Sequence, residues 1–268
     1  NQIIMFHNNI ALNDFFSILK KVNIWAFLGY FDLKLKYRRA FLGPWWVVIG
    51  MAISAGLMCM LWSTIFNLDW KEYLSYLFSG FIIWIYISNQ ISESPEIFFK
   101  ESARLIKSYP NPPLFYVFRK CFLNLLVFMH HIPLIIIICL FVQTDFNIRT
   151  VLTMPIGILL VFLNFIFLSS ILGILAARFK DIDPTVKALM PPMLLLTPVL
   201  WKPEMLGEFS YFIYFNPFTY FVSVIRNDLI GLSFDIYIWL GIIFITIINF
   251  VIFIILYHKK RNRIIFWI

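Results

Sequence analysis

An uncharged run of 22 residues, Trp45–Phe66, constrains the fold more than any other feature of the chain. A helix of about 20 apolar residues crosses the hydrocarbon core of a bilayer, so this run predicts a membrane span. Arg38 and Arg39 lie just before it, and Trp45 and Trp46 open it, as interfacial anchors do. The pattern predicts that the chain enters the membrane at Trp45 from the cytoplasmic side.

The composition extends this prediction to the whole chain. Of its 268 residues 61% are hydrophobic and 13% are charged, whereas soluble domains carry about 25% charged residues. We expect an all-α polytopic membrane protein, because helices satisfy their own backbone groups in lipid. Six runs are predicted as spans: Trp45–Phe66, Leu74–Ile91, Cys121–Val142, Val151–Ala177, Thr185–Trp201 and Ile236–Tyr257.

The basic residues predict the orientation of these spans. Of 22 Lys and Arg residues, 18 fall in segments that a six-span path leaves on one side. The other four are Lys71, Arg149, Lys202 and Arg226. Because positive residues stay cytoplasmic, both termini are expected in the cytoplasm. The net charge of +8 therefore indicates span flanks and contact with membrane lipid, and we expect no nucleic-acid partner.

The approach to the first span, residues 1–44, is expected to lie at the cytoplasmic interface. Phe31–Arg38 alternates apolar and charged residues like a strand, but Asp32 and Lys36 form a favourable helical pair, so we expect a helix. Four residues share the apolar face of an amphipathic helix before it: Leu12, Phe15, Phe16 and Leu19.

We expect a single domain, in which residues 45–201 carry the first five spans. Three further segments lie between or after the spans. Residues 95–108 predict a short helix outside the membrane, with Ser94 as its N-cap. Residues 202–235 are aromatic and semi-apolar, which predicts short re-entrant helices, one of them capped by Asn216. Residues 258–268 form a basic cytoplasmic tail.

The sequence lacks the motifs of several functional classes. It has no Gly-x-x-x-x-Gly-Lys-Ser/Thr phosphate loop, and no set of His and Cys at metal-ligand spacing, so neither a phosphate-loop ATP site nor a metal site is predicted. Beyond their first turn the spans hold no Asp, Glu, Lys or Arg, which proton- or sodium-coupled transporters need on their path. Uphill transport would draw its energy from elsewhere.

Two polar pairs leave alternatives open. His130 and His131 point about 100° apart on a helix, so one lines a cavity or both are bonded locally near Pro133. Asp181 and Asp183 form an Asp-x-Asp pair of the kind with which membrane glycosyltransferases hold a metal and a sugar nucleotide. Alternatively, Asp183 is the N-cap of the fifth span.

Four motifs together resemble a known family: Tyr37-Arg-Arg-Ala-Phe-Leu-Gly-Pro-Trp-Trp46, Arg178-Phe-Lys-Asp-Ile182, Thr197-Pro-Val-Leu-Trp201 and Asn216-Pro-Phe218. With six spans and a re-entrant segment before the last, they resemble the type-2 ABC exporter permeases. The nearest branch exports polysaccharide and polyol phosphate, namely O-antigen, capsule or teichoic acid. One departure is Lys180-Asp181, where the family often has Arg-Asp, and lysine lacks the bidentate geometry of arginine.

The resemblance implies a homodimer in the bacterial inner membrane with two copies of a cytoplasmic ABC ATPase. ATP and Mg would be held by that ATPase, and this chain would have no cofactor and no enzymatic activity. Residues 95–108 would be the coupling helix that docks on the ATPase. The residues expected at this contact are Glu96, Phe98, Lys100, Glu101, Arg104, Lys107, Arg178, Lys180 and Asp181.

The resemblance also implies that a lipid-linked polysaccharide, with O-antigen as first choice, passes between the two protomers. Cations at the inner leaflet suit the carrier pyrophosphate, and aromatic faces suit sugar rings. The residues expected to contact substrate are Tyr37, Arg38, Arg39, Trp45, Trp46, Trp201, Tyr211, Tyr214, Phe218 and Tyr220. Interfacial anchoring explains the same aromatic residues equally well. The alternative functions are a small-molecule or drug exporter of the same fold, and a membrane glycosyltransferase.

Overall fold

The computed structural model describes residues 10–108, 111–142, 148–232 and 235–268, and this part of the chain is helical with no β-strand. The all-α prediction is confirmed. The first helices are α2 (Ile10–Leu19), α3 (Val22–Lys36), α4 (Trp45–Phe66) and α5 (Trp70–Glu93), followed by a π-helical turn η1 (Ile97–Glu101) and α6 (Ala103–Ser108). Then come α7 (Pro113–Met129), α8 (Ile132–Val142), α9 (Ile148–Arg178), α10 (Ile182–Leu196), the 3₁₀ segment η2 (Pro203–Phe215), α11 (Pro217–Leu229) and α12 (Ile236–Trp267).

Five described helical stretches are long and apolar enough to cross a membrane: Trp45–Phe66, Trp70–Glu93, Pro113–Val142, Leu152–Arg178 and Ile236–Trp267. The chain is therefore a multi-pass membrane protein. The predicted fifth span corresponds to α10, which has 15 residues and contains Pro191 and Pro192. At about 1.5 Å per residue, α10 by itself is shorter than a hydrocarbon core of about 30 Å.

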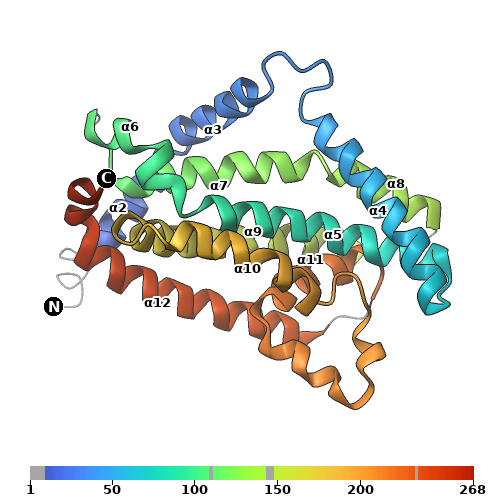
Figure 1. The fold of residues 1–268 in the computed structure, drawn as a ribbon. Coiled ribbons are helices and arrows are strands. Elements are labelled where there is room, and N and C mark those ends of the chain that lie inside the picture. Colours follow the sequence, from blue (N-terminus) through green and yellow to red (C-terminus); the bar gives the residue numbers. More distant parts are fainter. Residues whose placement is uncertain (1–9, 109–110, 143–147, 233–234) are drawn as a thin grey trace.

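Helix α5 forms the centre of the bundle and contacts α4, α7, α8, α9, α10 and α11 (Figure 1). In the 18-residue apolar stretch of α5, 72% of the residues are buried, compared with 28% in that of α4 and 17% in that of α12. Helix α2 and the C-terminal end of α12 lie at the same end of the bundle, here named the terminal end (Figure 1). The end that carries η2 is named the opposite end.

A buried polar network joins α5 to α7 and α9. The Gln90 side chain, fully buried, donates from Nε2 to Ser169 Oγ over 2.8 Å and to Cys121 Sγ over 3.3 Å. Its Oε1 accepts from Asn124 Nδ2 at 3.1 Å, and the same Nδ2 lies 2.9 Å from Glu93 Oε2. In a medium without water these groups have only one another as partners, so the network fixes how the three helices meet.

Helix α3 packs on α7 and confirms the helix expected at Phe31–Arg38 as far as Lys36, with Tyr37 as its C-cap. The expected pair of Asp32 with Lys36 is wrong, because Arg119 of α7 engages the Asp32 carboxylate through Nε, 2.6 Å from Oδ2, and through Nη2. A bidentate guanidinium contact is stronger than an exposed helical pair.

The apolar residues expected on α2 are divided between the bundle and the outside of the chain. Ala11 and Ile18 are buried, and Phe15 packs between Phe118 and Phe167, whereas Phe16 and Leu19 are exposed. The helix therefore turns a narrower face, spaced i, i+4 and i+7, toward the bundle.

The last helix runs past the predicted end of the sixth span to Trp267, so it takes in most of the basic tail. Asp14 of α2 bonds to both Tyr257 Oη, at 2.9 Å, and Arg261 Nε, at 2.6 Å. These contacts bind the first and the last described helices together at the terminal end.

Replacement of Gln90 by leucine is expected to lower the free energy of unfolding by about 1–3 kcal/mol, because Ser169 and Asn124 lose a buried partner. The matched control is Ser54→Ala, whose exposed hydroxyl bonds only the carbonyl of Gly50 in its own helix. Thermal unfolding of the detergent-purified variants measures both. Equal stability of the two variants would mean that the network does not hold the helices.

Candidate functional site

The link after α5 is a continuation of that helix rather than a new one. Ser94 has helical backbone angles, and its hydroxyl donates to the carbonyl of Gln90 and lies 2.7 Å from Ser169 Oγ. The prediction that Ser94 is an N-cap is therefore wrong: the hydroxyl bonds a carbonyl behind it instead of an amide ahead of it. We name residues 96–108, which comprise η1 and α6, the coupling segment.

The coupling segment is anchored from inside the bundle. Ile97 and Phe98 are fully buried, and the Phe98 ring packs on Gly173 of α9, where a Cβ would lie 3.0 Å from two ring carbons. Phe98 thus holds the segment on α9 and is not accessible on the surface of the chain. Lys100 and Lys107 are exposed, and Lys107 bonds the carbonyl of Ile268. The side chains of Glu101 and Arg104 lie outside the described residues.

The connection from α9 to α10 lies beside the coupling segment. Lys180 Nζ stands 4.0 Å from the centroid of the Phe99 ring, and the Arg178 guanidinium lies 5.8 Å from that of Trp267. Helix α10 begins at Ile182, so Asp183 falls in its first turn and the N-cap predicted there is wrong; Asp181 holds that position without a side-chain cap bond. The described residues contain no group of three His, Cys, Asp or Glu that could hold a metal.

A basic loop joins α3 to α4. Arg38 and Arg39 are exposed and form no ion pair with any described residue. The chain from Leu35 to Ala40 lines an open hollow of about 510 Å³. Burial, with a smaller contribution from the Glu93 carboxylate, raises the pKa of Tyr37, so its hydroxyl stays neutral and able to donate. The loop offers two free guanidinium groups next to a phenol, a set of donors suited to phosphate oxygens.

The first tryptophan of the predicted entry lies beside the joint between α7 and α8. The ring centroids of Trp45 and His130 are 6.1 Å apart. Trp45 and Trp46 are both exposed at the start of α4. His130 Nδ1 lies 2.7 Å from the carbonyl oxygen of Leu126, and His131 Nδ1 lies 3.0 Å from that of Val127. Both histidines are thus bonded locally through Nδ1.

His131 also lines a small cavity. The cavity has a volume of about 20 Å³, which holds one water, and its polar lining includes Lys36, Asn89 and Asn124. His131 Nε2 and Tyr86 Oη are buried and lack a hydrogen-bond partner in the described part of the chain. The basic loop therefore begins next to a polar patch at the middle of the Pro113–Val142 stretch.

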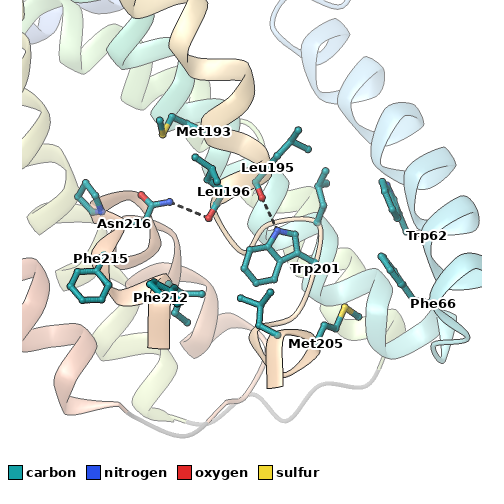
Figure 2. Close-up of a pocket in the computed structure, with 14 residues that line it drawn as sticks. Trp62, Phe66, Met193, Leu195, Leu196, Trp201, Met205, Phe212, Phe215 and Asn216 are labelled. Carbon is teal, nitrogen blue, oxygen red and sulfur yellow. Dashed lines mark hydrogen bonds between the residues drawn. The ribbon is translucent and has the colours of Figure 1, made fainter. Parts of the chain in front are cut away.

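The opposite end contains a large apolar pocket of about 810 Å³ (Figure 2). Trp201 stands in it, fixed by a 2.8 Å bond from Nε1 to the carbonyl of Leu195. Asn216 closes one side: its Nδ2 bonds Thr197 Oγ1 at 2.9 Å, and its Oδ1 accepts from the amide of Phe218, which confirms the predicted N-cap. The other labelled lining residues are Trp62, Phe66, Met193, Leu196, Met205, Phe212 and Phe215.

The remaining predicted aromatic residues do not converge on this pocket. Tyr211 and Tyr214 are exposed on η2. Phe218 meets Trp84 of α5 edge-on at 5.7 Å, and the Tyr220 ring covers Gly241 of α12. Phe218 and Tyr220 thus pack α11 against its neighbours. Tyr211 stacks on Phe212 at 4.6 Å and Tyr214 lies 6.3 Å from Tyr220, with both tyrosines partly open to the outside.

Sequence reasoning missed the burial of Arg226 at this end. Arg226 was placed among the basic residues of the outer side, yet it is 3% exposed. Its guanidinium bonds the carbonyl of Pro198 and stands 4.2 Å from the centroid of the Tyr76 ring. The available signal was an arginine in the semi-apolar segment after Asn216, where an ionisable residue at membrane depth needs a partner in protein.

The arrangement defines an all-helical integral membrane protein with no metal-ligand cluster in its described residues, with an exposed basic loop before α4 and an apolar pocket at the opposite end. The chain belongs to the ABC-2 type transporter family, whose family model matches residues 25–230. It is therefore a transport subunit of the membrane, with ATP hydrolysed by a separate subunit, and the expectation of a type-2 ABC permease without enzymatic activity is confirmed.

A curated relative shows a more specific similarity. The chain is 26% identical over 191 residues to the O-antigen export system permease protein RfbA of Klebsiella pneumoniae. This match covers 69% of the chain and 72% of the relative.

The apolar pocket is expected to accept a hydrocarbon chain. A lipid that carries a photoreactive diazirine in its acyl chain is expected to label peptides containing Met193 or Met205, because the pocket lining is mostly apolar. Leu196→Trp fills the pocket and should reduce this labelling several-fold, while Leu189→Trp, exposed on the same helix outside the pocket, should not. Equal labelling in the two variants, measured by mass spectrometry, would contradict occupancy by lipid.

Proposed function

We propose that this chain is the permease subunit of an ATP-driven exporter of lipid-linked polysaccharide, with O-antigen as the first substrate to test. It works as a homodimer in the bacterial inner membrane, with both termini cytoplasmic. Two copies of an ABC ATPase bind ATP and Mg and dock on the coupling segment. The observation that carries the substrate class is the unpaired basic loop, and the similarity to an O-antigen export permease supports it.

The loop has the chemistry that a carrier pyrophosphate requires. Arg38 and Arg39 supply planar guanidinium groups that form paired bonds with phosphate oxygens, and Lys36 adds a third positive charge beside them. No described carboxylate neutralises the two arginines, so they remain available to an anion from outside the chain. Trp45 and Trp46 follow directly and offer ring faces to the first sugars.

The conduit lies between two copies of the chain. Helix α4 exposes large apolar residues along one side, among them Ile53, Leu57, Leu61 and Ile65, and α10 exposes Leu189, Leu195 and Leu196. Two such surfaces brought together enclose a wide path without charges. In this proposal α10 and the chain to Trp201 make the sixth crossing of the membrane, and η2 and α11 re-enter it as a gate on the outer side.

A small-molecule or drug exporter of the same fold is the second candidate. It is favoured by the apolar pocket, which suits a greasy drug as well as a lipid tail. Intracellular polymer accumulates in a deletion strain only if the chain exports polysaccharide. The glycosyltransferase alternative is not maintained: Asp183 is bound to Lys187 at 2.8 Å, and the family is one of transport subunits.

The double variant Arg38→Ala, Arg39→Ala is expected to lower polysaccharide export about tenfold or more, because one charged hydrogen bond contributes about 1.5–3 kcal/mol. Surface polysaccharide is measured by immunoblot and normalised to permease in the membrane. The control is Lys20→Ala, Lys21→Ala, an exposed basic pair between α2 and α3. Equal losses of export and of membrane insertion in the arginine variant would reduce the loop to a topological anchor.

A coupling-segment variant tests the ATPase contact. With Glu96, Lys100, Glu101 and Arg104 all changed to alanine, we expect the ATPase to be lost from affinity-purified permease while the permease still inserts. An ATPase that co-purifies in unchanged amount would show that these residues do not form its docking site.

A further inference from the structure

Helix α10 is attached to the rest of the chain by few internal contacts. Met190 is the one buried residue of α10, and the helix begins after a short connection from α9. A helix with so little buried surface depends on specific contacts to fix its position. The contacts at its base are therefore decisive for how it moves.

Glu96, at the start of the coupling segment, supplies such a contact. Its carboxylate is largely buried and accepts from Lys187 of α10 and from Lys100 at 2.8 Å, both on Oε1. Lys187 also pairs with Asp183, one turn earlier in α10, at 2.8 Å. Lys100 pairs with Glu96 within the coupling segment, and Asp183 pairs with Lys187 within α10. The bond between Glu96 and Lys187 joins the coupling segment to α10.

The protonation state of Glu96 supports a persistent bond. Burial acts to raise the pKa of this carboxyl, but hydrogen bonds and positive charges from Lys100 and Lys187 outweigh it, so the pKa lies below its ordinary value. The carboxylate is therefore ionised at neutral pH. The Lys187 side chain is 41% exposed and Lys100 also bonds Glu96, so the pair contributes modestly to stability, and its importance lies in joining the coupling segment to α10.

A second contact acts in the same direction. Lys180, in the connection that leads into α10, stands over the ring of Phe99 in the coupling segment. The neighbouring Phe98 is locked against Gly173 of α9. A displacement of the segment therefore acts on α10 through Lys187 and on its leading connection through Lys180.

We propose that Lys187 is a positioning residue that transmits movement of the coupling segment to α10 through Glu96, so that ATP hydrolysis by the partner subunit moves the wall of the export path. The proposal rests on the proposed function, in which the segment docks on the ATPase and α10 lines the path. Lys187 itself touches neither ATP nor substrate.

The test compares Lys187→Met with Asp183→Asn in the intact exporter, reconstituted with its ATPase. Three quantities are measured: ATPase co-purification, ATP hydrolysis, and polysaccharide transported per ATP hydrolysed. Lys187→Met should retain co-purification and ATP hydrolysis within about twofold and lower transport per ATP at least fivefold. Asp183→Asn, which leaves the bond to Glu96 in place, should keep all three.

Two further variants separate transmission from folding. Lys187→Arg keeps the charge and should restore transport per ATP to within about twofold of the unmodified chain. The exchanged pair Glu96→Lys, Lys187→Glu should recover part of the lost coupling relative to either single reversal. Unchanged transport per ATP in Lys187→Met, or no recovery in Lys187→Arg, overturns the proposal. Failure of the unmodified chain to bind an ATPase or to move polysaccharide would instead overturn the proposed function.

Discussion

The whole architecture depends on the need of buried polar groups for partners inside the bundle, since lipid supplies none. Gln90 meets this need for three helices at once, because its amide both donates to Ser169 and accepts from Asn124. Moving α5, α7 or α9 by one turn would leave several of these groups unpaired. The same constraint fixes Ser94 through Ser169, and with it the start of the coupling segment.

The class of fold followed from the sequence because it depends on local, one-dimensional properties. An uncharged run predicted the helix Trp45–Phe66, and the asparagine before Pro217 predicted the start of a helix there. Both signals depend only on residues that are neighbours in the sequence, and both helices are observed. Helix limits were less predictable: α12 continues to Trp267 because its last turns have protein to pack on, with Ile264 fully buried.

Side-chain partners could not be predicted in the same way. Asp32 had a suitable neighbour in Lys36 but bonds Arg119, 87 residues away, because tertiary packing brings a better-shaped cation to it. Asp183 was expected at a helix end and instead pairs with Lys187 inside the helix. For the candidate site, the basic loop and Trp201 could be singled out from composition, whereas Glu96–Lys187 and Arg226 depend on which helices meet.

The bond network around Asp14 has a consequence for biosynthesis. The partners of this carboxylate, Tyr257 and Arg261, are made more than 240 positions later than Asp14. At about 5–20 residues per second, Asp14 waits on the order of ten seconds or longer before these partners exist. The apolar contacts of Phe15 with Phe118 and Phe167 become available earlier, so α2 meets the bundle first through its apolar face and is fixed later through its carboxylate.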